Sequence, residues 1–302
     1  MDTAALSAFL EVARSASFSQ AAEQLHLTQP AVSKRISGLE ESLGVSLFDR
    51  VGRQVSLTEA GRALLPRAQQ LLLDLEDMKR AVGNLSGPVT GTLKVGTSHH
   101  IGLHRLPPAL RAFSTQYRQV RLDLRFIDSE EAYDAVLAGD LELGIVTLPP
   151  VPDARLVARE IWPDPLAFIA GREHPLAQQA QVSLADLTRH PAILPSSSTF
   201  TRQIAAQLFQ ASGLEMQVSM TTNYLETIRM MASIGLGWSV LPASMAESGS
   251  DIVILNIDGV ALSRSLGVVY HPRRILSRAA QAMLALLLPA AKPGTAHHRT
   301  SP

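Results

Sequence analysis

Four side chains near the N-terminus are of types that read the edges of DNA bases: Gln29, Ala31, Ser33 and Lys34. Glutamine can form two hydrogen bonds with the N6/N7 edge of adenine, and lysine can reach guanine or a phosphate. Serine can bond either kind of group, and the alanine methyl can contact a thymine methyl. Any one of these residues alone fits an ordinary surface position. Because all four fall in one short segment, they predict a surface that reads base pairs.

A second set of polar residues follows predicted strands in the C-terminal two-thirds of the chain. Hydroxyls and free backbone N–H groups at the starts of helices suit a carboxylate, and a protonated histidine would add to the attraction. We therefore predict a small anionic effector, with an ordinary helix-capping role for each Ser or Thr as the alternative. The candidate effector contacts are Thr97, Ser98, His99, His100, Ser129, Thr147, Ser198, Thr199 and Phe200.

His100 and His104 are four residues apart, a spacing that can place two imidazoles on one helix face and bind a metal. No carboxylate or cysteine lies near them in the sequence, so no metal site is predicted. The chain has no cysteine at all, which excludes a thiol nucleophile and a Cys-ligated zinc. It also lacks a phosphate-binding Gly-Lys-Ser loop, a Gly-x-Ser-x-Gly elbow and a His-Glu-x-x-His motif. The sequence thus predicts neither an enzyme nor a bound cofactor.

Three short helical patterns position the segment that would read DNA. Apolar residues recur three and four apart in each pattern, with Thr28 as the expected N-cap of the third helix and Gly44 at its end. The short turn at 26–28 is typical of a helix-turn-helix, whose second helix enters the major groove by its N-terminal residues. Residues 46–57 then indicate a β-hairpin, a wing with Arg53 at its tip, placed to enter a minor groove.

Five motifs follow one another almost without a gap between residues 6 and 61: FSQAAEQL at 18–25, TQPAVSK at 28–34, LEESLG at 39–44, LFDR at 47–50 and LTEAG at 57–61. Together they resemble the DNA-binding head of the LysR-type transcriptional regulators. The resemblance also implies a dimerising linker helix, an effector-binding domain and contact with RNA polymerase. It implies a DNA-contacting surface formed by Gln29, Pro30, Ala31, Ser33, Lys34 and Arg53.

Residues 58–82 carry apolar side chains three and four apart over their whole length, which predicts one long helix. A long helix between two domains has too little neighbouring chain to cover such a stripe, so we predict that it pairs with the same helix of a second subunit. Docking of the stripe on the chain's own C-terminal domain is the alternative. A homodimer would place two recognition helices on two half-sites, which predicts an inverted-repeat DNA site, and further contacts would give a homotetramer.

From residue 91 onward strand and helix patterns alternate, which is typical of an α/β domain with a mainly parallel sheet. A helix is expected at 105–116 and strands at 166–170 and 266–270. Two such α/β lobes resemble the type 2 periplasmic-binding-protein-like fold, which the family resemblance also implies. The predicted domains are an all-α winged helix-turn-helix domain at 1–58, a linker helix and hinge at 59–87, and an effector-binding domain at 88–302, with lobe 1 at about 91–165 plus 268–291 and lobe 2 at about 166–267.

The composition allows this organisation. The chain has 302 residues, a formal net charge of zero and 46% hydrophobic residues, so DNA affinity must come from a few positioned groups. The start lacks a signal-peptide pattern and no segment is apolar enough to span a bilayer, which predicts a cytoplasmic protein without membrane contact. We predict a sequence-specific transcription regulator controlled by an effector. The alternatives are a cytoplasmic small-molecule-binding protein without promoter control and a transport binding protein, for which an export signal is missing.

Overall fold

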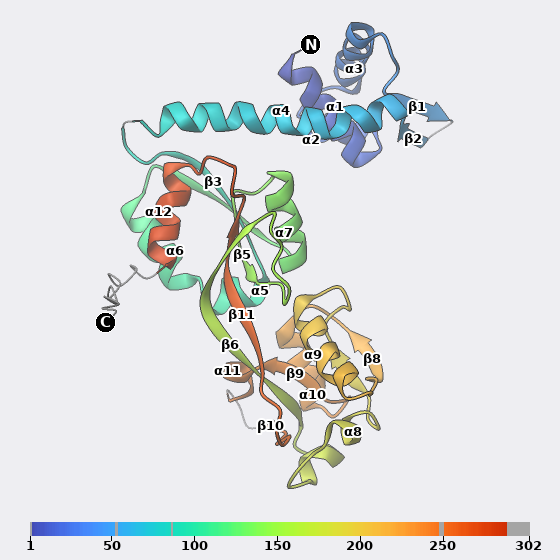
Figure 1. Ribbon diagram of the computed structural model, residues 1–302, viewed down its shortest axis with the longest axis vertical. Coiled ribbons are helices and arrows are strands. Elements are labelled where there is room, and N and C mark those ends of the chain that lie inside the picture. The colour runs from blue at the N-terminus through green and yellow to red at the C-terminus, as the bar shows by residue number, and fades with distance from the viewer. Residues whose placement is uncertain (1, 52–53, 86, 248–250, 289–302) are drawn as a thin grey trace, which may run out of the picture. The chain divides into compact units, whose positions relative to one another are not determined.

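The computed structural model describes residues 2–51, 54–85, 87–247 and 251–288, and the chain divides into two compact units, 1–87 and 88–302 (Figure 1). The order of elements confirms the predicted three helices, hairpin and long helix. In the N-terminal unit these elements are α1 (Thr3–Ser15), α2 (Phe18–Gln24), α3 (Gln29–Leu43), β1 (Phe48–Val51), β2 (Gln54–Leu57) and α4 (Glu59–Gly83).

Side-chain caps start each helix of the N-terminal unit. Asp2, Ser17, Thr28 and Thr58 each accept a hydrogen bond from the backbone N–H three residues further on. Such caps satisfy backbone donors that have no partner inside the helix. Gly44 ends α3 with a φ of +69°, a left-handed conformation that a residue without Cβ adopts at little cost. The predicted start and end of the third helix are therefore both confirmed.

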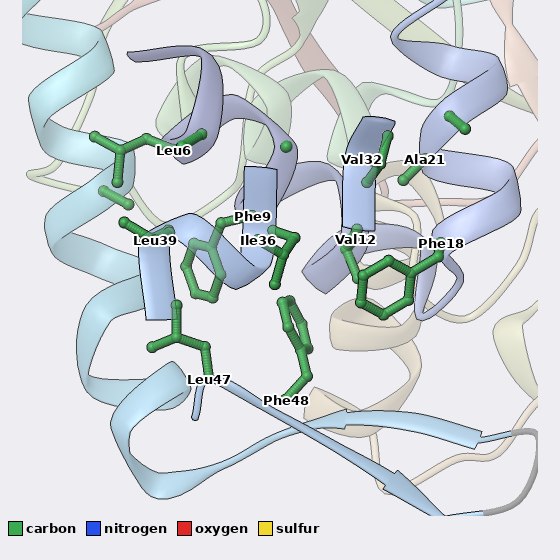
Figure 2. Packing of buried hydrophobic residues seen from close by; sticks show 14 residues of the cluster. Leu6, Phe9, Val12, Phe18, Ala21, Val32, Ile36, Leu39, Leu47 and Phe48 are labelled. Atoms are coloured by element: carbon green, nitrogen blue, oxygen red, sulfur yellow. The ribbon is translucent and has the colours of Figure 1, made fainter. Parts of the chain in front are cut away.

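The three short helices share one core with the beginning of the hairpin (Figure 2). The rings of Phe9 and Phe18 lie against Phe48, with centroids 5.4 and 5.8 Å from it. Because the buried residues of α3 recur three and four apart, one face of that helix is held on the core and the other face stays available. These buried α3 residues are Val32, Ile36 and Leu39.

The long helix α4 is only partly covered within the described residues of its unit. Leu64 and Leu65 pack against the N-terminal core, whereas Met78 and Val82 are 59% and 70% exposed. The apolar stripe that predicts a second subunit is thus uncovered toward the C-terminal end of the helix. Among the described residues no helix, α4 included, has both the length and the apolar character needed to cross a membrane.

The C-terminal unit is an α/β structure of two lobes, which confirms the predicted fold class. Its elements are β3 (Gly91–Thr97), α5 (His99–His104), α6 (Pro107–Gln116), β4 (Val120–Phe126), α7 (Ser129–Ala138), β5 (Leu143–Thr147), β6 (Val157–Gly171), the 3-10 helix η1 (Pro175–Gln178), α8 (Leu184–Leu187), β7 (Ala192–Leu194), α9 (Phe200–Ala211), β8 (Val218–Thr221), α10 (Leu225–Ser233), β9 (Ser239–Pro242), α11 (Ala243–Ala246), β10 (Ile252–Ile254), β11 (Leu262–Tyr270) and α12 (Arg278–Leu287).

The large sheet of this unit is mixed rather than mainly parallel. Its strand order is β10-β6-β11-β5-β3-β4, with β9 paired to β6. Strand β3 runs parallel to β4 and β5, but β11 is antiparallel to β5 and β6, and β6 is antiparallel to β9 and β10. The prediction of a mainly parallel sheet is therefore wrong. The reason is that the chain passes between the lobes on β6 and returns on β11, and two such strands lie side by side in opposite directions.

Strands β6 and β11 run side by side through both lobes (Figure 1), paired from Leu166 opposite Leu262 to Val157 opposite Tyr270. One end of this ribbon belongs to the core of lobe 1, where Val268 is buried. The other end belongs to a core of lobe 2, where Leu166 is buried. The predicted lobe boundaries near 165 and 268 fall inside these two strands.

Proline explains two incorrect element boundaries. The helix predicted at 105–116 begins two residues later, as α6 at Pro107, and a separate helix, α5, ends before it at His104. Pro107 and Pro108 lack an N–H and so begin a new helix instead of continuing the old one. The strand predicted from residue 166 begins at Val157. Pro163 and Pro165 interrupt its apolar pattern, and a proline normally argues against a strand.

Candidate DNA interface and effector cavity

The first turns of α3 carry the predicted DNA contacts. Three of these residues are exposed: Gln29, Pro30 and Lys34. Ala31 and Ser33 are half-buried. The helix begins here with N–H groups that carry partial positive charge, so amide, hydroxyl and ammonium groups stand at an end suited to a phosphate backbone.

The hairpin that follows α3 is antiparallel, with Phe48 opposite Leu57 and Val51 opposite Gln54. Its first strand is anchored by Phe48, whose side chain is buried in the core of the unit. Arg53, predicted at the tip of the wing, lies outside the described residues. Its role in a minor groove stays a prediction.

A cavity of about 420 Å³ lies in the C-terminal unit between segments of both lobes. Lobe 1 contributes the starts of α5 and α7, and lobe 2 contributes the starts of α9 and α10. Residues predicted from strand ends more than one hundred positions apart therefore meet in one place. Those that line the cavity are Ser98, His99, His100, Ser129, Thr147 and Thr199.

Three predicted effector contacts do not line this cavity. Thr97 is fully buried at the end of β3. Ser198 is exposed, and its hydroxyl lies 3.1 Å from that of Ser196. Phe200 donates its backbone N–H to Oε1 of Glu130 over 2.6 Å. The rule that ligands bind at strand ends thus predicts where the cavity lies, but it does not predict which side chains line it.

Two of the predicted lining hydroxyls already have structural partners. Thr199 Oγ1 donates to the carbonyl of Ser196 and accepts from the N–H of Arg202, so it is an ordinary N-cap of α9. Ser129 Oγ accepts from the N–H of Thr147 over 3.0 Å. Ser98 precedes α5 without a side-chain capping bond. The hydroxyl of Ser98 is therefore available to bond a ligand.

Arg264 is the residue of the cavity that the sequence did not reveal. It is 6% exposed, its Nε donates to Oδ2 of Asp164 over 2.8 Å, and its Nη1 donates to Oγ1 of Thr201 over 2.7 Å. Asp164 also accepts from Nη2 of Arg105 over 3.0 Å. Burial lowers the pKa of Arg264, and the contact with Asp164 opposes that shift. Nη2 of Arg264 has no hydrogen-bond partner among the described residues, so this buried cation has a donor available for an anion.

Carboxylates also line the cavity, around the start of α7: Asp128, Glu130 and Glu131. Asp128 Oδ2 accepts from Nδ2 of Asn223 over 2.5 Å, a contact between the lobes. Burial raises the pKa of Glu130, and the hydrogen bond from the N–H of Phe200 opposes that rise. The Glu130 carboxylate thus accepts a hydrogen bond at the N-terminus of α9, where an effector carboxylate is expected to bind. An effector carboxylate would have to compete with Glu130 for this N–H group.

The two histidines of the cavity differ in their surroundings. His100 is buried, and burial, helped by the charge of Arg264, lowers its pKa to about 4. Its ring is neutral at pH 7, so the expectation that a protonated histidine attracts the effector is wrong for His100. His99 is exposed, and its ring stands edge-on to Phe126 and Tyr224, with centroids 6.2 and 5.7 Å away. His99 helps to form an aromatic border of the cavity.

Asn223 and Tyr224 were also missed, although a signal for them exists. They lie between β8 and α10, at the same kind of strand-to-helix junction that revealed Ser98 and Ser129. Arg264 stands in the middle of a strand. Its signal is a lone charged residue in a strand that is otherwise apolar toward its C-terminal end.

Two protein families match the chain. Residues 3–62 match the family described as bacterial regulatory helix-turn-helix protein, lysR family. Residues 86–292 match the LysR substrate binding domain. The first range contains the first turns of α3 and the hairpin, and the second contains the whole cavity. Both are families of transcriptional regulators, not of enzymes.

Full-length relatives agree with these matches. The transcriptional activator CmpR of Synechocystis sp. is 30% identical over 279 residues, covering 91% of each chain. The RuBisCO operon transcriptional regulator of Allochromatium vinosum is 30% identical, covering 94% of each chain.

Solved structures share the fold. Full-length OxyR from Pseudomonas aeruginosa has a TM-score of 0.70 at 23% identity, covering 95% of this chain and 94% of that one. CbnR in complex with its target DNA has a TM-score of 0.62 at 23% identity, covering 95% and 99%. Because the matched families span both units and the relatives match over nearly their full length, the chain belongs to the LysR-type transcriptional regulators.

Proposed function

We propose that the protein binds an operator in promoter DNA through α3 and the hairpin, and that a small monocarboxylate bound in the cavity controls this binding. The observation that carries the effector proposal is the free Nη2 of buried Arg264, which lines the cavity together with Ser98. A guanidinium N–H and a hydroxyl are complementary to the two oxygens of one carboxylate.

The charges of the cavity favour an effector with a single negative charge. Arg264 supplies one positive charge, whereas Asp128, Glu130 and Glu131 are acidic. A multiply charged anion such as a phosphorylated compound would be repelled by these carboxylates. A monocarboxylate can pair with Arg264 while its neutral part lies near Tyr224 and the other aromatic residues of the border.

The regulator we propose is a homodimer paired through α4, because the C-terminal part of its apolar stripe, including Met78 and Val82, is exposed. Two α3 helices would then read an inverted repeat. Contacts between C-terminal units would make a tetramer. Effector binding favours one of two arrangements of the assembly, and this changes contact with RNA polymerase in the cytoplasm.

Ser33→Ala and Lys34→Ala test the DNA surface. Ser33→Ala is expected to reduce the ratio of operator to non-specific affinity roughly tenfold, because it removes a hydrogen bond to a base edge. Lys34→Ala is expected to lower the slope of log affinity against log salt concentration by about 1, because it removes an ammonium group that contacts a phosphate. Both are measured by gel shift at several salt concentrations, on a fragment that the protein selects from random-sequence DNA.

Ser42→Ala is the matched control, because Ser42 lies in the last turn of α3 and donates to the carbonyl of Leu39. It should bind like the wild type. Unchanged discrimination in Ser33→Ala, together with an unchanged salt slope in Lys34→Ala, would show that these turns of α3 do not contact DNA. Selection of no sequence from the pool would instead favour a small-molecule-binding protein without promoter control.

A thermal-shift screen with monocarboxylic acids tests the effector site. A ligand at one hundred times its Kd should raise the melting temperature of the C-terminal unit by roughly 5–10 °C. Ser98→Ala is expected to weaken the best ligand by roughly 10–100-fold, because a hydrogen bond to a charged group is lost. Ser197→Ala, an exposed serine that does not line the cavity, is the control. If Ser98→Ala and the wild type bind the ligand equally well, the ligand does not bind in this cavity.

Glu130→Gln should change affinity in the opposite direction. The amide oxygen can still accept from the N–H of Phe200, but the competing negative charge is gone. We expect the same monocarboxylate to bind roughly 3–10-fold more tightly, since a partly screened unit charge is removed from the site. Weaker binding by this variant, measured in the same thermal-shift titration, would show that the Glu130 side chain supports the bound ligand instead of repelling it.

A further inference from the structure

A cluster of metal-binding side chains joins the two lobes beside the effector cavity. His100 and His104 belong to α5 of lobe 1, and Glu226 belongs to α10 of lobe 2. One donor atom from each residue lies within 4.8 Å of the other two. His104 Nε2 is 3.1 Å from Glu226 Oε1, and the rings of His100 and His104 have centroids 4.8 Å apart. The prediction of no metal site rested on the lack of a nearby carboxylate, and the fold supplies one from 122 positions away.

His100 gives a second, independent indication of a ligand. Its side chain is buried, with an exposed fraction of 5%, and neither ring nitrogen has a hydrogen-bond partner among the described residues. A buried polar group without a partner is costly, and nearly all such groups in folded proteins are satisfied by protein, water or an ion. The neutral ring has a lone pair that a metal ion would satisfy.

We propose that His100, His104 and Glu226 bind one Zn²⁺ ion and leave its fourth coordination position open. Two imidazoles and a carboxylate form a known three-residue donor set for zinc with one open position. Ca²⁺ and Mg²⁺ prefer shells of oxygen ligands, and Cu⁺ prefers sulfur, so this donor set disfavours them.

The three donor atoms can reach coordinating distance of one ion through small side-chain movements. Two ligands at about 2.1 Å from a tetrahedral zinc are roughly 3.4 Å apart, and the cluster spans up to 4.8 Å. The side chains of His104 and Glu226 are 44% and 39% exposed, so neither is held by close packing on all sides. His100, the buried ligand, would be the fixed point of the site.

The charges near the cluster also admit a cation. Arg264 lies close enough to affect the pKa of His100 and would repel the ion. Its charge is opposed by Asp164, which is 1% exposed and accepts from its Nε at 2.8 Å. Glu226 itself contributes one negative charge to the site. A bound ion would link α5 to α10 and hold the lobes together at the edge of the cavity.

Zinc binding by the full-length protein, first stripped of metal with a chelator, tests the proposal. We expect one Zn²⁺ per chain by equilibrium dialysis, and absorption bands of tetrahedral Co²⁺ when cobalt replaces zinc. Loss of a group that only hydrogen-bonds to a metal ligand typically weakens metal binding by roughly 10–100-fold. Loss of a direct ligand in His104→Gln or Glu226→Gln should therefore weaken zinc binding by more than about 100-fold and remove the cobalt bands. Both variants replace partly exposed side chains, so their metal-free melting temperatures should equal that of the wild type.

Control variants separate this site from other histidines. His190→Ala changes a histidine of lobe 2 whose ring meets that of His174, and it should bind zinc normally. The double variant His297→Ala/His298→Ala removes a histidine pair of the sequence that lies outside the described residues, and it should also bind normally. The proposal is overturned by a wild type that does not bind zinc at micromolar concentrations. It is equally overturned by unchanged binding in His104→Gln and Glu226→Gln, or by binding that disappears with His297 and His298. Because the readout is the metal itself, the result does not depend on whether a carboxylate is the effector.

Discussion

Asp164→Asn is expected to lower the unfolding free energy of the C-terminal unit by about 3–5 kcal/mol, the usual cost of breaking a buried ion pair from one side. Asp164 is 1% exposed, and its two oxygens accept from Arg264 at 2.8 Å and from Arg105 at 3.0 Å. Asparagine has nearly the same shape but no charge, and its amide N–H₂ can only donate. One of the two arginines would therefore lose its acceptor, and Arg264 would remain buried without a countercharge.

Urea unfolding followed by tryptophan fluorescence measures this effect on one unit alone. The chain has two tryptophans, Trp162 and Trp238, and both belong to the C-terminal unit. Asp123→Asn is the control, because Asp123 forms an exposed pair with Arg125 at 3.6 Å and should contribute about 0–1 kcal/mol. An Asp164→Asn midpoint equal to that of the wild type would mean that Arg264 is not a buried cation, and the effector proposal would lose its main support.

Phe9→Ala is expected to remove about 3–5 kcal/mol from the stability of the N-terminal unit. The ring of Phe9 has no exposed surface and lies 5.4 Å from that of Phe48, so truncation leaves a cavity between α1 and the hairpin. A domain of this size typically has about 5–15 kcal/mol of stability in total. Operator binding should therefore fall steeply at 37 °C, although Phe9 does not itself belong to the DNA surface.

The N-terminal unit has no tryptophan, so its unfolding is followed by far-ultraviolet circular dichroism. In Phe9→Ala, the circular dichroism signal of α1–α3 should be lost at a lower urea concentration than the one at which tryptophan fluorescence changes. In the wild type, this signal should persist to a higher urea concentration than in the variant. Leu43→Ala is the control, because Leu43 is 40% exposed in the last turn of α3. Wild-type operator affinity and an unchanged helix transition in Phe9→Ala would show that this core does not support the recognition helix.

The N-terminal unit could be predicted from sequence almost element by element because its signals are local. A cap such as Thr28, a terminator such as Gly44 and an apolar face such as Val32 to Leu39 lie within a few residues of the helix they define. Each therefore acts on a structure that forms over a short stretch of chain. The proposed DNA surface follows from the same local pattern, since it is the face of α3 that the core leaves uncovered.

The cavity could be predicted only in outline because its chemistry depends on distant contacts. Ser98 and Ser129 were found from strand ends, but Arg264 acquires its importance from Asp164, one hundred positions earlier in the chain. Glu226 is likewise brought to His104 by the packing of one lobe on the other. Nothing local to these residues distinguishes them from ordinary charged side chains. Their roles depend on the antiparallel pairing of β6 with β11, which the sequence pattern did not reveal.

The shared ribbon of β6 and β11 limits how the two lobes can move. An antiparallel ladder from Val157 to Leu166, with one irregularity in its register, resists stretching and sliding, because either movement would break its hydrogen bonds. Such a ladder twists more easily, and its register already shifts between Leu266 and Gly267. A side chain at Gly267 would place a Cβ 2.2 Å from the carbonyl oxygen of Arg159, so the close approach of the strands there requires glycine. Rotation of one lobe against the other about this ribbon is therefore the movement that the two connecting strands oppose least.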